Sequence, residues 1–224
     1  YLHSICMKDS KHITVVIADD HPMLLRGLND ELTEKGYHVL GQAENGIRAL
    51  QLIIEHQPMV ALIDIDMPVL KGLEVIKKAK LKTSSTRFIL LSFHRETTYV
   101  IQAKTLSIDG YLLKEDSFDE IEKCIHAVIN GEQYFSNSFK GMEMTSANKE
   151  LRMLRNLTPS ERKILKLIAK SYSSQEMADS LYVSIRTIEK HRSNIISKLQ
   201  VNPSTHSLTH WALENKDIIL NFHT

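Results

Sequence analysis

Met59-Val-Ala-Leu-Ile-Asp64-Ile-Asp66-Met-Pro68 is the stretch that decides the fold, because an unbroken apolar run ends abruptly in carboxylates and a proline. An apolar run without alternation is typical of a strand buried on both faces, as in a parallel sheet. Comparable runs occur at 13–18, 37–42, 88–91 and 110–113. Helical spacing of apolar residues follows these runs, over 23–35, 46–56, 73–81, 97–106 and 117–130. This alternation predicts an α/β fold whose five-stranded parallel sheet carries helices on both faces.

Composition places the chain among ordinary globular proteins. Of its 224 residues, 42% are hydrophobic and 25% are charged. No apolar run approaches the ~18 residues that a membrane-spanning helix needs, and the start lacks the apolar segment of a signal peptide. Cys6 and Cys124 have neither metal-site nor disulfide spacing. We therefore expect a cytoplasmic protein without membrane contact, and leave residues 1–6, before Met7, out of the fold prediction.

The distribution of charge indicates two domains. Acidic residues exceed basic ones up to about residue 130, whereas basic residues exceed acidic ones from Leu157 onward. Between them, the stretch 131–156 is polar and rich in small residues, as in a linker, and a helix is expected over about 149–155. After Leu157 the pattern predicts four helices and no strand. The predicted limits are 12–131 for the first domain, 132–154 for the linker and 155–224 for the second domain.

Polar residues close the apolar runs of the first domain. Asp19 and Asp20 follow the first run, Asp64 the third, Ser92 the fourth and Lys114 the fifth. Ligands of open parallel sheets bind where the carboxyl ends of the strands meet, so these side chains should converge. Clustered carboxylates repel one another unless a cation lies among them. Oxygen ligands of this kind favour Mg²⁺.

This set of side chains fits phosphoryl transfer to an aspartate. Asp64 is the predicted nucleophile, since a carboxylate can form an aspartyl-phosphate. Asp20 and Asp64 would be the main Mg²⁺ ligands, with Asp19 as an accessory acid. Lys114 would pair with the phosphoryl group, and Ser92 would donate a hydrogen bond to it. Taken singly, an Asp at a strand end is more often a helix cap or turn residue, and a Lys such as Lys114 is more often a solvated charge. The prediction rests on finding all of these side chains at the ends of successive strands.

These motifs resemble the receiver domain of bacterial two-component response regulators. They are Ala18-Asp19-Asp20-His21-Pro22, Asp64-Ile-Asp-Met-Pro68 with Gly72, Ser92, and Asp109-Gly-Tyr-Leu-Leu-Lys114. The resemblance covers residues 12–131 and implies a flavodoxin-like (βα)5 fold with strand order 2-1-3-4-5. It implies that a sensor histidine kinase phosphorylates Asp64 and that the backbone carbonyl of Asp66 contacts Mg²⁺. Tyr111 matches the aromatic switch position, and Ser92 the hydroxyl that moves toward the phosphoryl group.

The second domain has the pattern of a helix-turn-helix. Thr158, Pro159 and Glu161 form a strong helix start. A short helix is predicted over 175–181, and Ser184 caps a longer one that runs to about residue 199. On that helix Ile188, Ile195 and Leu199 share one face, which should pack inward, and polar residues occupy the other. A solvated charged face is the alternative reading, but Arg, Lys, Ser and Asn together suit a DNA major groove.

The second domain also resembles a family, the LuxR-type helix-turn-helix of the NarL/FixJ regulators. The matching stretches are Leu157-Thr-Pro-Ser-Glu161, Met177-Ala178, and Ser184-Ile-Arg-Thr-Ile-Glu-Lys-His-Arg-Ser-Asn194 with Lys198-Leu199. The resemblance implies that Glu189, Lys190 and Ser193 face bases, and that Arg186, Thr187 and Arg192 lie near phosphates. Lys198, beside this face, is a further predicted phosphate contact. Glu189 and Ser193 stand where some members carry lysines, so base preference cannot be transferred.

Together these features predict a response regulator that controls transcription and is not an enzyme. Phosphorylation of Asp64 would shift the receiver conformation and control sequence-specific binding to double-stranded DNA. A homodimer is expected on phosphorylation or on DNA, and the helix near 207–214 resembles the pairing segment; core packing of Trp211 is the alternative.

Two alternatives to this prediction share some of its sequence features. A haloacid-dehalogenase-type phosphatase is suggested by Asp64-Ile-Asp66, but Met-Pro follows in place of that family's Gly-Thr, and a cap domain has no room. The other alternative is a constitutive or ligand-gated DNA binder whose first domain only dimerises.

Overall fold

The computed structural model describes residues 12–139, 149, 151–201 and 207–222. Residues 1–6 and much of the predicted linker, 140–148 and 150, lie outside these ranges. The chain divides into two compact units: residues up to 95 with 107–139 form one, and 96–106 with the residues after 139 form the other. The domain limits at 131 and 155 stay predictions.

Six parallel strands form one sheet in the order β2-β1-β3-β4-β5-β6. The strands are β1 (Thr14–Ala18), β2 (His38–Ala43), β3 (Val60–Asp64), β4 (Arg87–Ser92), β5 (Gly110–Leu113) and β6 (Tyr134–Phe135). The predicted order 2-1-3-4-5 is confirmed. Strand β6 was not predicted and its residues fell within the predicted linker, because a two-residue strand is too short to show a period.

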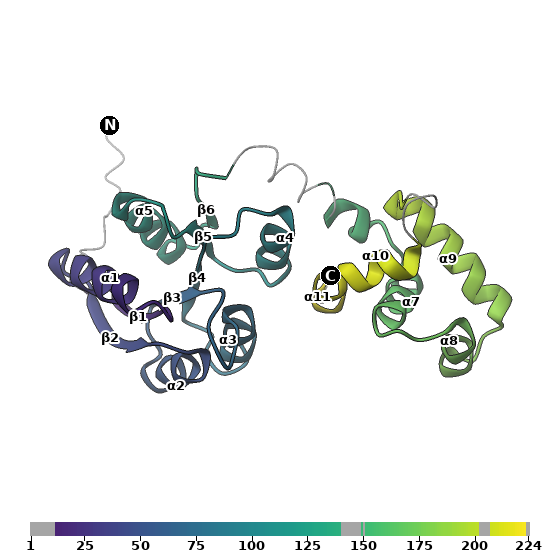
Figure 1. The fold of residues 1–224 in the computed structure, drawn as a ribbon, viewed down its shortest axis with the longest axis horizontal. Helices are drawn as coiled ribbons and strands as arrows, with labels where there is room; N and C mark the ends of the chain where they lie inside the picture. The colour runs from purple at the N-terminus through teal and green to yellow at the C-terminus, as the bar shows by residue number, and fades with distance from the viewer. Residues whose placement is uncertain (1–11, 140–148, 150, 202–206, 223–224) are drawn as a thin grey trace. The chain divides into compact units, whose positions relative to one another are not determined.

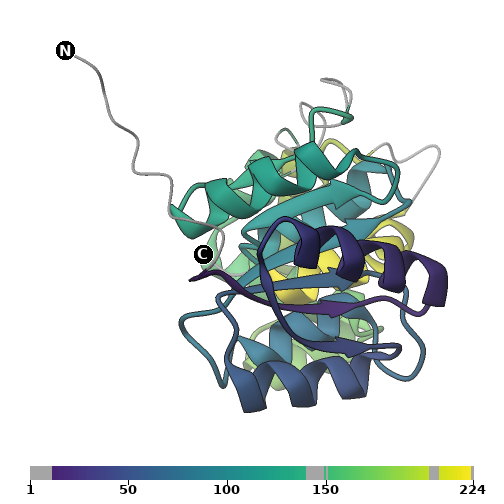
Figure 2. The ribbon, with the colours of Figure 1, turned by 90° about the vertical axis from the view of Figure 1, so that its left-hand side faces the viewer.

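Helices cover both faces of this sheet, as predicted (Figure 1). They are α1 (Pro22–Glu34), α2 (Gly46–His56), α3 (Gly72–Ala79) and α5 (Phe118–Ile129), whereas α4 (Thr97–Thr105) groups with the second unit. Helices α1 and α5 lie on one face and α2 and α3 on the other, which Figure 2 shows from the side of α1. Fully buried strand residues such as Ile17 and Leu62 pack with Leu32 of α1 and Ile125 of α5. The core therefore fixes the strands whose ends carry the polar residues.

Glu120 of α5 holds β6 and the residues after it. Its Oε1 accepts hydrogen bonds from the Tyr134 hydroxyl (2.8 Å) and from the backbone and side-chain N–H groups of Asn137 (both 3.1 Å). Burial favours a higher pKa for Glu120, but the bonds from Asn137, Tyr134 and Lys123 outweigh it and hold the pKa below its usual value. The carboxylate is therefore charged at neutral pH and fixes residues 134–137 against α5.

The second unit is helical. Besides α4, its helices are α7 (Pro159–Ala169), α8 (Ser174–Leu181), α9 (Ile185–Leu199), α10 (Leu208–Glu214) and α11 (Lys216–Asn221). Residues 151–155 are also helical, as the sequence indicated. The prediction of four helices after Leu157 is corrected to five within the described ranges, because the chain turns at Asn215 and continues as α11. No helix in these ranges has both the length and the apolarity that crossing a membrane requires.

Replacing Glu120 by Gln should lower the free energy of unfolding of the first unit by about 1 to 2 kcal/mol at pH 7, since hydrogen bonds to a charged group are lost. Because the folded pKa of Glu120 is lowered, its stabilisation is present above the ordinary pKa and disappears as pH falls through the folded one. Urea unfolding at pH 7 and at about pH 4 should therefore show a smaller difference from wild type at the lower pH. The matched control is Glu132→Gln at an exposed site, and an equal loss in both variants would contradict the role of Glu120.

Candidate functional site

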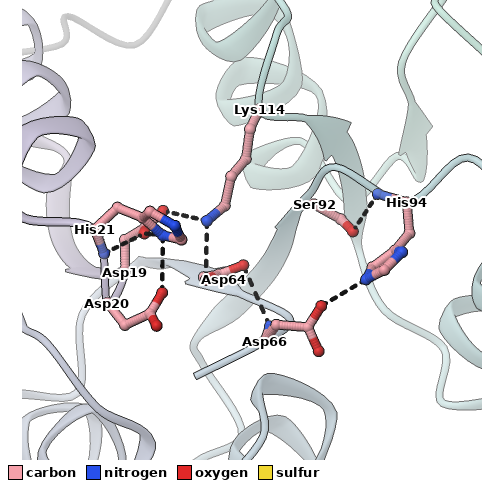
Figure 3. Close-up of polar contacts among 8 residues, drawn as sticks. All are labelled: Asp19, Asp20, His21, Asp64, Asp66, Ser92, His94 and Lys114. Carbon is pink, nitrogen blue, oxygen red and sulfur yellow. Dashed lines mark hydrogen bonds and ion pairs between the residues drawn. The ribbon is translucent and has the colours of Figure 1, made fainter. Parts of the chain in front are cut away.

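The polar residues predicted to converge lie at the carboxyl ends of four parallel strands. Asp19 follows β1, Asp64 is the last residue of β3, Ser92 ends β4 and Lys114 follows β5. The backbone supports this edge, because the N–H of Asp19 donates to the carbonyl of Ala43 in β2 (3.0 Å). Figure 3 shows that the side chains of Asp19, Asp64 and Lys114 point toward one another.

Lys114 bridges two carboxylates at the centre of the site. Its Nζ lies 2.8 Å from Asp19 Oδ2 and 2.9 Å from Asp64 Oδ2. All three side chains are at most 4% exposed. The electrostatic attraction within an ion pair so far from water is strong, because little solvent screens it. The three residues therefore form one electrostatic unit.

The charge balance of this unit leaves room for more positive charge. Burial raises the pKa of Asp64, the Lys114 bonds oppose this rise, and the nearby charge of Asp19 adds to it. Burial favours a lower pKa for Lys114, but its bonds to Asp19 and Asp64 outweigh it and the pKa is raised. Lys114 is thus a fixed cation, and it does not fully compensate the carboxylates around it. A second cation would stabilise the ionised form of Asp64.

Asp20 and His21 complete an acidic cluster beside Lys114. Ligand atoms of Asp19, Asp20, His21 and Asp64 all lie within 4.8 Å of one another. His21 Nδ1 is 2.9 Å from Asp20 Oδ1 and 3.1 Å from Asp19 Oδ1. Three carboxylates in such proximity fit a hard cation such as Mg²⁺, with His21 closing one side. His21 belongs to the Ala18-Asp19-Asp20-His21-Pro22 motif, but no role was predicted for its side chain.

Ser92 and Tyr111 both contact His94, in the loop after β4. Ser92 Oγ accepts a hydrogen bond from the His94 N–H (2.9 Å), and the Tyr111 hydroxyl donates to the His94 carbonyl (3.0 Å). Ser92 and Tyr111 are fully buried. The predicted hydroxyl and aromatic switch residues are therefore joined through one peptide segment.

Asp66 lies at the edge of the site with its side chain turned away from Lys114. Its N–H donates to Asp64 Oδ1 (3.3 Å), and its Oδ2 is 2.5 Å from His94 Nε2 (Figure 3). Nothing in the sequence pattern pointed to His94, which reaches this position only through the loop conformation. Gly72 allows the loop after β3 to close, since a Cβ there would lie 2.1 Å from the Asp64 carbonyl oxygen.

In the second unit, α8 and α9 form the expected helix-turn-helix. Ser173 and Ser184 cap the two helices, and Ile188, Ile195 and Leu199 of α9 are buried as predicted. Of the seven predicted DNA contacts, Arg186, Glu189, Lys190 and Ser193 are exposed on α9, and Thr187, Arg192 and Lys198 are half-buried. The exposed set forms one polar face, which is the candidate DNA-reading face.

Intramolecular partners hold several of these side chains. Ser174 Oγ donates to Glu189 Oε1 (2.6 Å), and Arg192 Nε lies 3.8 Å from Glu189 Oε2. Arg192 Nη2 also donates to Thr209 Oγ1 of α10 (3.1 Å). Thr187 Oγ1 lies 2.8 Å from Ser184 Oγ at the helix cap. A base contact by Glu189 would therefore compete with its bond to Ser174.

Lys198 is tied to the interior of the second unit. Its Nζ donates to Glu161 Oε2 (2.7 Å), and Glu161 is only 2% exposed. The same carboxylate accepts the Thr158 N–H in the capping box of α7 (2.8 Å). Burial favours a higher pKa for Glu161, but these bonds outweigh it and lower the pKa. Among the predicted contacts, Lys198 therefore has a clear structural role.

Both parts of the chain are similar to known protein families. Residues 15–126 match the model of the response regulator receiver domain, and residues 155–212 match that of the bacterial regulatory proteins of the luxR family. The chain is 33% identical over 210 residues to the transcriptional regulatory protein MctR of Rhizobium johnstonii, covering 93% of this chain and 97% of the relative. It is 30% identical over 200 residues to the nitrate/nitrite response regulator NarL of Escherichia coli, covering 87% and 93%. The solved receiver domain of NarL from Mycobacterium tuberculosis is 36% identical, with a TM-score of 0.52, and covers 54% of this chain and 98% of that domain.

Replacing Lys198 by Met should destabilise the second unit by about 2 kcal/mol, because a buried carboxylate loses its charged partner. Thermal or urea unfolding of the full chain measures this loss. The matched control is Lys190→Met on the same helix, whose side chain is exposed and whose loss should change stability by less than about 0.5 kcal/mol. Equal stability of the two variants would make Lys198 a surface residue in solution.

Proposed function

Because this chain belongs to the response regulators that join a receiver domain to a LuxR-type DNA-binding domain, we propose that phosphorylation of Asp64 controls its binding to double-stranded DNA. The phosphoryl donor is a sensor histidine kinase, and the protein acts in the cytoplasm, where DNA is accessible. The observation that carries the proposal is the buried unit in which Lys114 bridges Asp19 and Asp64.

The chemical step is transfer of a phosphoryl group from a phosphohistidine. A carboxylate oxygen of Asp64 forms a bond to phosphorus as the phosphorus–nitrogen bond breaks, and the electron pair of that bond returns to the imidazole. Lys114, already fixed beside Asp64, pairs with the transferred group and offsets its charge. The Ser92 hydroxyl, at the end of the neighbouring strand, donates a hydrogen bond to the phosphoryl oxygens.

Asp19, Asp20 and Asp64 are the residues that would hold Mg²⁺, together with the backbone carbonyl of Asp66. Their proximity and the raised pKa of Asp64 both support a second cation in this site. When bound, the ion neutralises charge on the phosphoryl oxygens and so lowers the barrier to transfer. Asp19 also fixes Lys114, which makes it an accessory acid and not the principal ligand.

Phosphorylation acts on DNA binding through a change in population. Ser92 moves toward the phosphoryl group and gives up its bond with the His94 N–H. That movement disturbs the loop whose carbonyl accepts the Tyr111 hydroxyl, so Tyr111 responds as the switch residue. The state with the higher affinity for DNA then becomes more populated.

On DNA, α9 occupies the major groove. Lys190 and Ser193 face base edges, Arg186, Thr187 and Arg192 face phosphates, and Glu189 accepts from a cytosine amino group if it leaves Ser174. Lys198 is the weakest member of this set, because its partner Glu161 holds it. Two copies bind together, and α10, with the half-buried Trp211, supplies their contact.

Asp64→Asn should abolish the uptake of a phosphoryl group from acetyl phosphate, because an amide cannot act as the nucleophile. Intact-mass spectrometry after incubation with Mg²⁺ measures the uptake, and chelation of the metal should suppress it in wild type. Asp66→Asn is the control, since it keeps the backbone carbonyl and should still accept a phosphoryl group. Equal uptake by Asp64→Asn and wild type would refute the assignment. Wild-type protein that binds DNA tightly and takes up nothing would instead be a constitutive DNA binder.

Substitutions on α9 should separate base readers from phosphate contacts. Arg192→Ala should weaken binding to all sequences and reduce the salt-dependence slope by about one. Lys190→Ala should change base preference at one position, by about 1 to 3 kcal/mol. Selection from a random DNA library, followed by anisotropy titrations at several salt concentrations, measures both effects. Lys163→Ala, at an exposed site on α7, is the control, and identical behaviour of Lys190→Ala and Arg192→Ala would show that the face is wrongly assigned.

A further inference from the structure

An aromatic cluster joins the predicted switch residue to the end of the first unit. The ring of Tyr111 lies 4.8 Å from that of Phe139 and 6.2 Å from that of Phe135, between ring centroids. Tyr111 has no exposed surface and Phe139 only 6%. Phe135 and Phe139 come from β6 and the turn after it, a part of the chain that the sequence alone places in the linker. We refer to Tyr111, Phe135 and Phe139 as the aromatic cluster.

Backbone hydrogen bonds fix the two phenylalanines relative to β5. The N–H of Tyr134 donates to the Asp109 carbonyl and that of Ser136 to the Tyr111 carbonyl (both 2.9 Å). The N–H of Phe139 then donates to the Ser136 carbonyl (3.1 Å), which closes the turn. The backbone of Tyr111 and the turn that carries Phe139 are therefore adjacent, and a shift of one changes the packing of the other.

Polar contacts bring the same turn to the loops around the site. Ser138 Oγ donates to Asp116 Oδ1 (2.5 Å), just after Lys114 in the chain. Arg95, next to His94, donates to the Ser138 carbonyl (3.4 Å) and pairs with Glu115 (2.5 Å). The turn is thus held by both loops that flank the predicted phosphoryl position.

A continuous series of contacts therefore runs from the site to residue 139. Ser92 Oγ binds the His94 N–H, the His94 carbonyl binds the Tyr111 hydroxyl, and the Tyr111 ring packs on Phe139. Every member of this series is buried or partly buried. Beyond residue 139 the chain continues toward the DNA-binding domain.

We infer that Phe135 and Phe139 are positioning residues for Tyr111. Through them, phosphorylation of Asp64 changes the strength of the hydrogen bonding between β6 and β5, at the start of the connection to the DNA-binding domain. The inference rests on the proposed function, since it requires Asp64 to be the phosphoacceptor. It adds the element through which the signal leaves the receiver: a two-residue strand whose attachment depends on the aromatic cluster. A physical coupling of this kind must show itself as a change in β6 caused by phosphorylation.

Hydrogen exchange of the full-length protein tests the inference. Exchange of the amides of Tyr134 and Ser136 is followed by mass spectrometry with and without acetyl phosphate and Mg²⁺, and intact mass records phosphoryl uptake in the same samples. In wild type, phosphorylation should change exchange at these amides about fivefold or more, the lower end of typical coupling between sites. Asp64→Asn should show no change.

Phe139→Ala should exchange rapidly at Tyr134 and Ser136 without phosphodonor and should no longer respond to it, while still taking up the phosphoryl group. Phe139→Leu, which keeps an apolar side chain, should restore part of the response. Val39→Ala is the matched control, because Val39 is a partly buried residue of β2, at the opposite edge of the sheet from β6; it should respond like wild type.

The inference is overturned if phosphorylated wild type shows unchanged exchange at Tyr134 and Ser136, or if Phe139→Ala responds as wild type does. Absence of phosphoryl uptake in wild type would remove the proposed function and this inference together. Unchanged exchange with normal uptake would remove the inference alone.

Discussion

The contact of Lys114 with both Asp19 and Asp64 is the interaction on which the rest of the structure depends. A lysine and two carboxylates are costly to bury, and they remain buried only because each compensates the other. Three strands must end at the same level for this contact to form, and the parallel order β1-β3-β4-β5 achieves that. The architecture of the sheet is therefore inseparable from the chemistry at its edge.

The single positive charge of Lys114 only partly compensates the negative charges of Asp19 and Asp64. Asp64 has a raised pKa despite its lysine partner, so any added positive charge nearby would favour its ionised form. The acidic Asp20 and the loop of Asp66 lie where such charge would be held. In the second unit, by contrast, Glu161 has a lowered pKa because Lys198 and Thr158 satisfy it. Burial therefore leaves one of these carboxylates with a raised pKa, while charged and polar partners lower the pKa of the other.

Most of the fold and of the central site could be predicted from the sequence, for a physical reason. Buried parallel strands are nearly pure apolar runs, so the residue that ends each run is visible, and Asp19, Asp64, Ser92 and Lys114 were located in this way. His94 was not predictable, because only the conformation of a loop brings it to Asp66. The partner of Lys198 was equally hidden, since Glu161 lies far away in sequence and had already been assigned to a helix cap. The short β6 and the break before α11 left no period to detect.

The sixth strand also decides where the first unit can be separated from the rest. A fragment that stops at residue 131 would lack Tyr134 to Phe139, and would leave the hydrogen-bonding edge of β5 open to other chains. It would also expose the Tyr111 ring and leave the Glu120 carboxylate without Tyr134 and Asn137. An isolated receiver prepared with that boundary would therefore be a poor representative of the intact one, prone to self-association through a sheet edge that the natural chain covers.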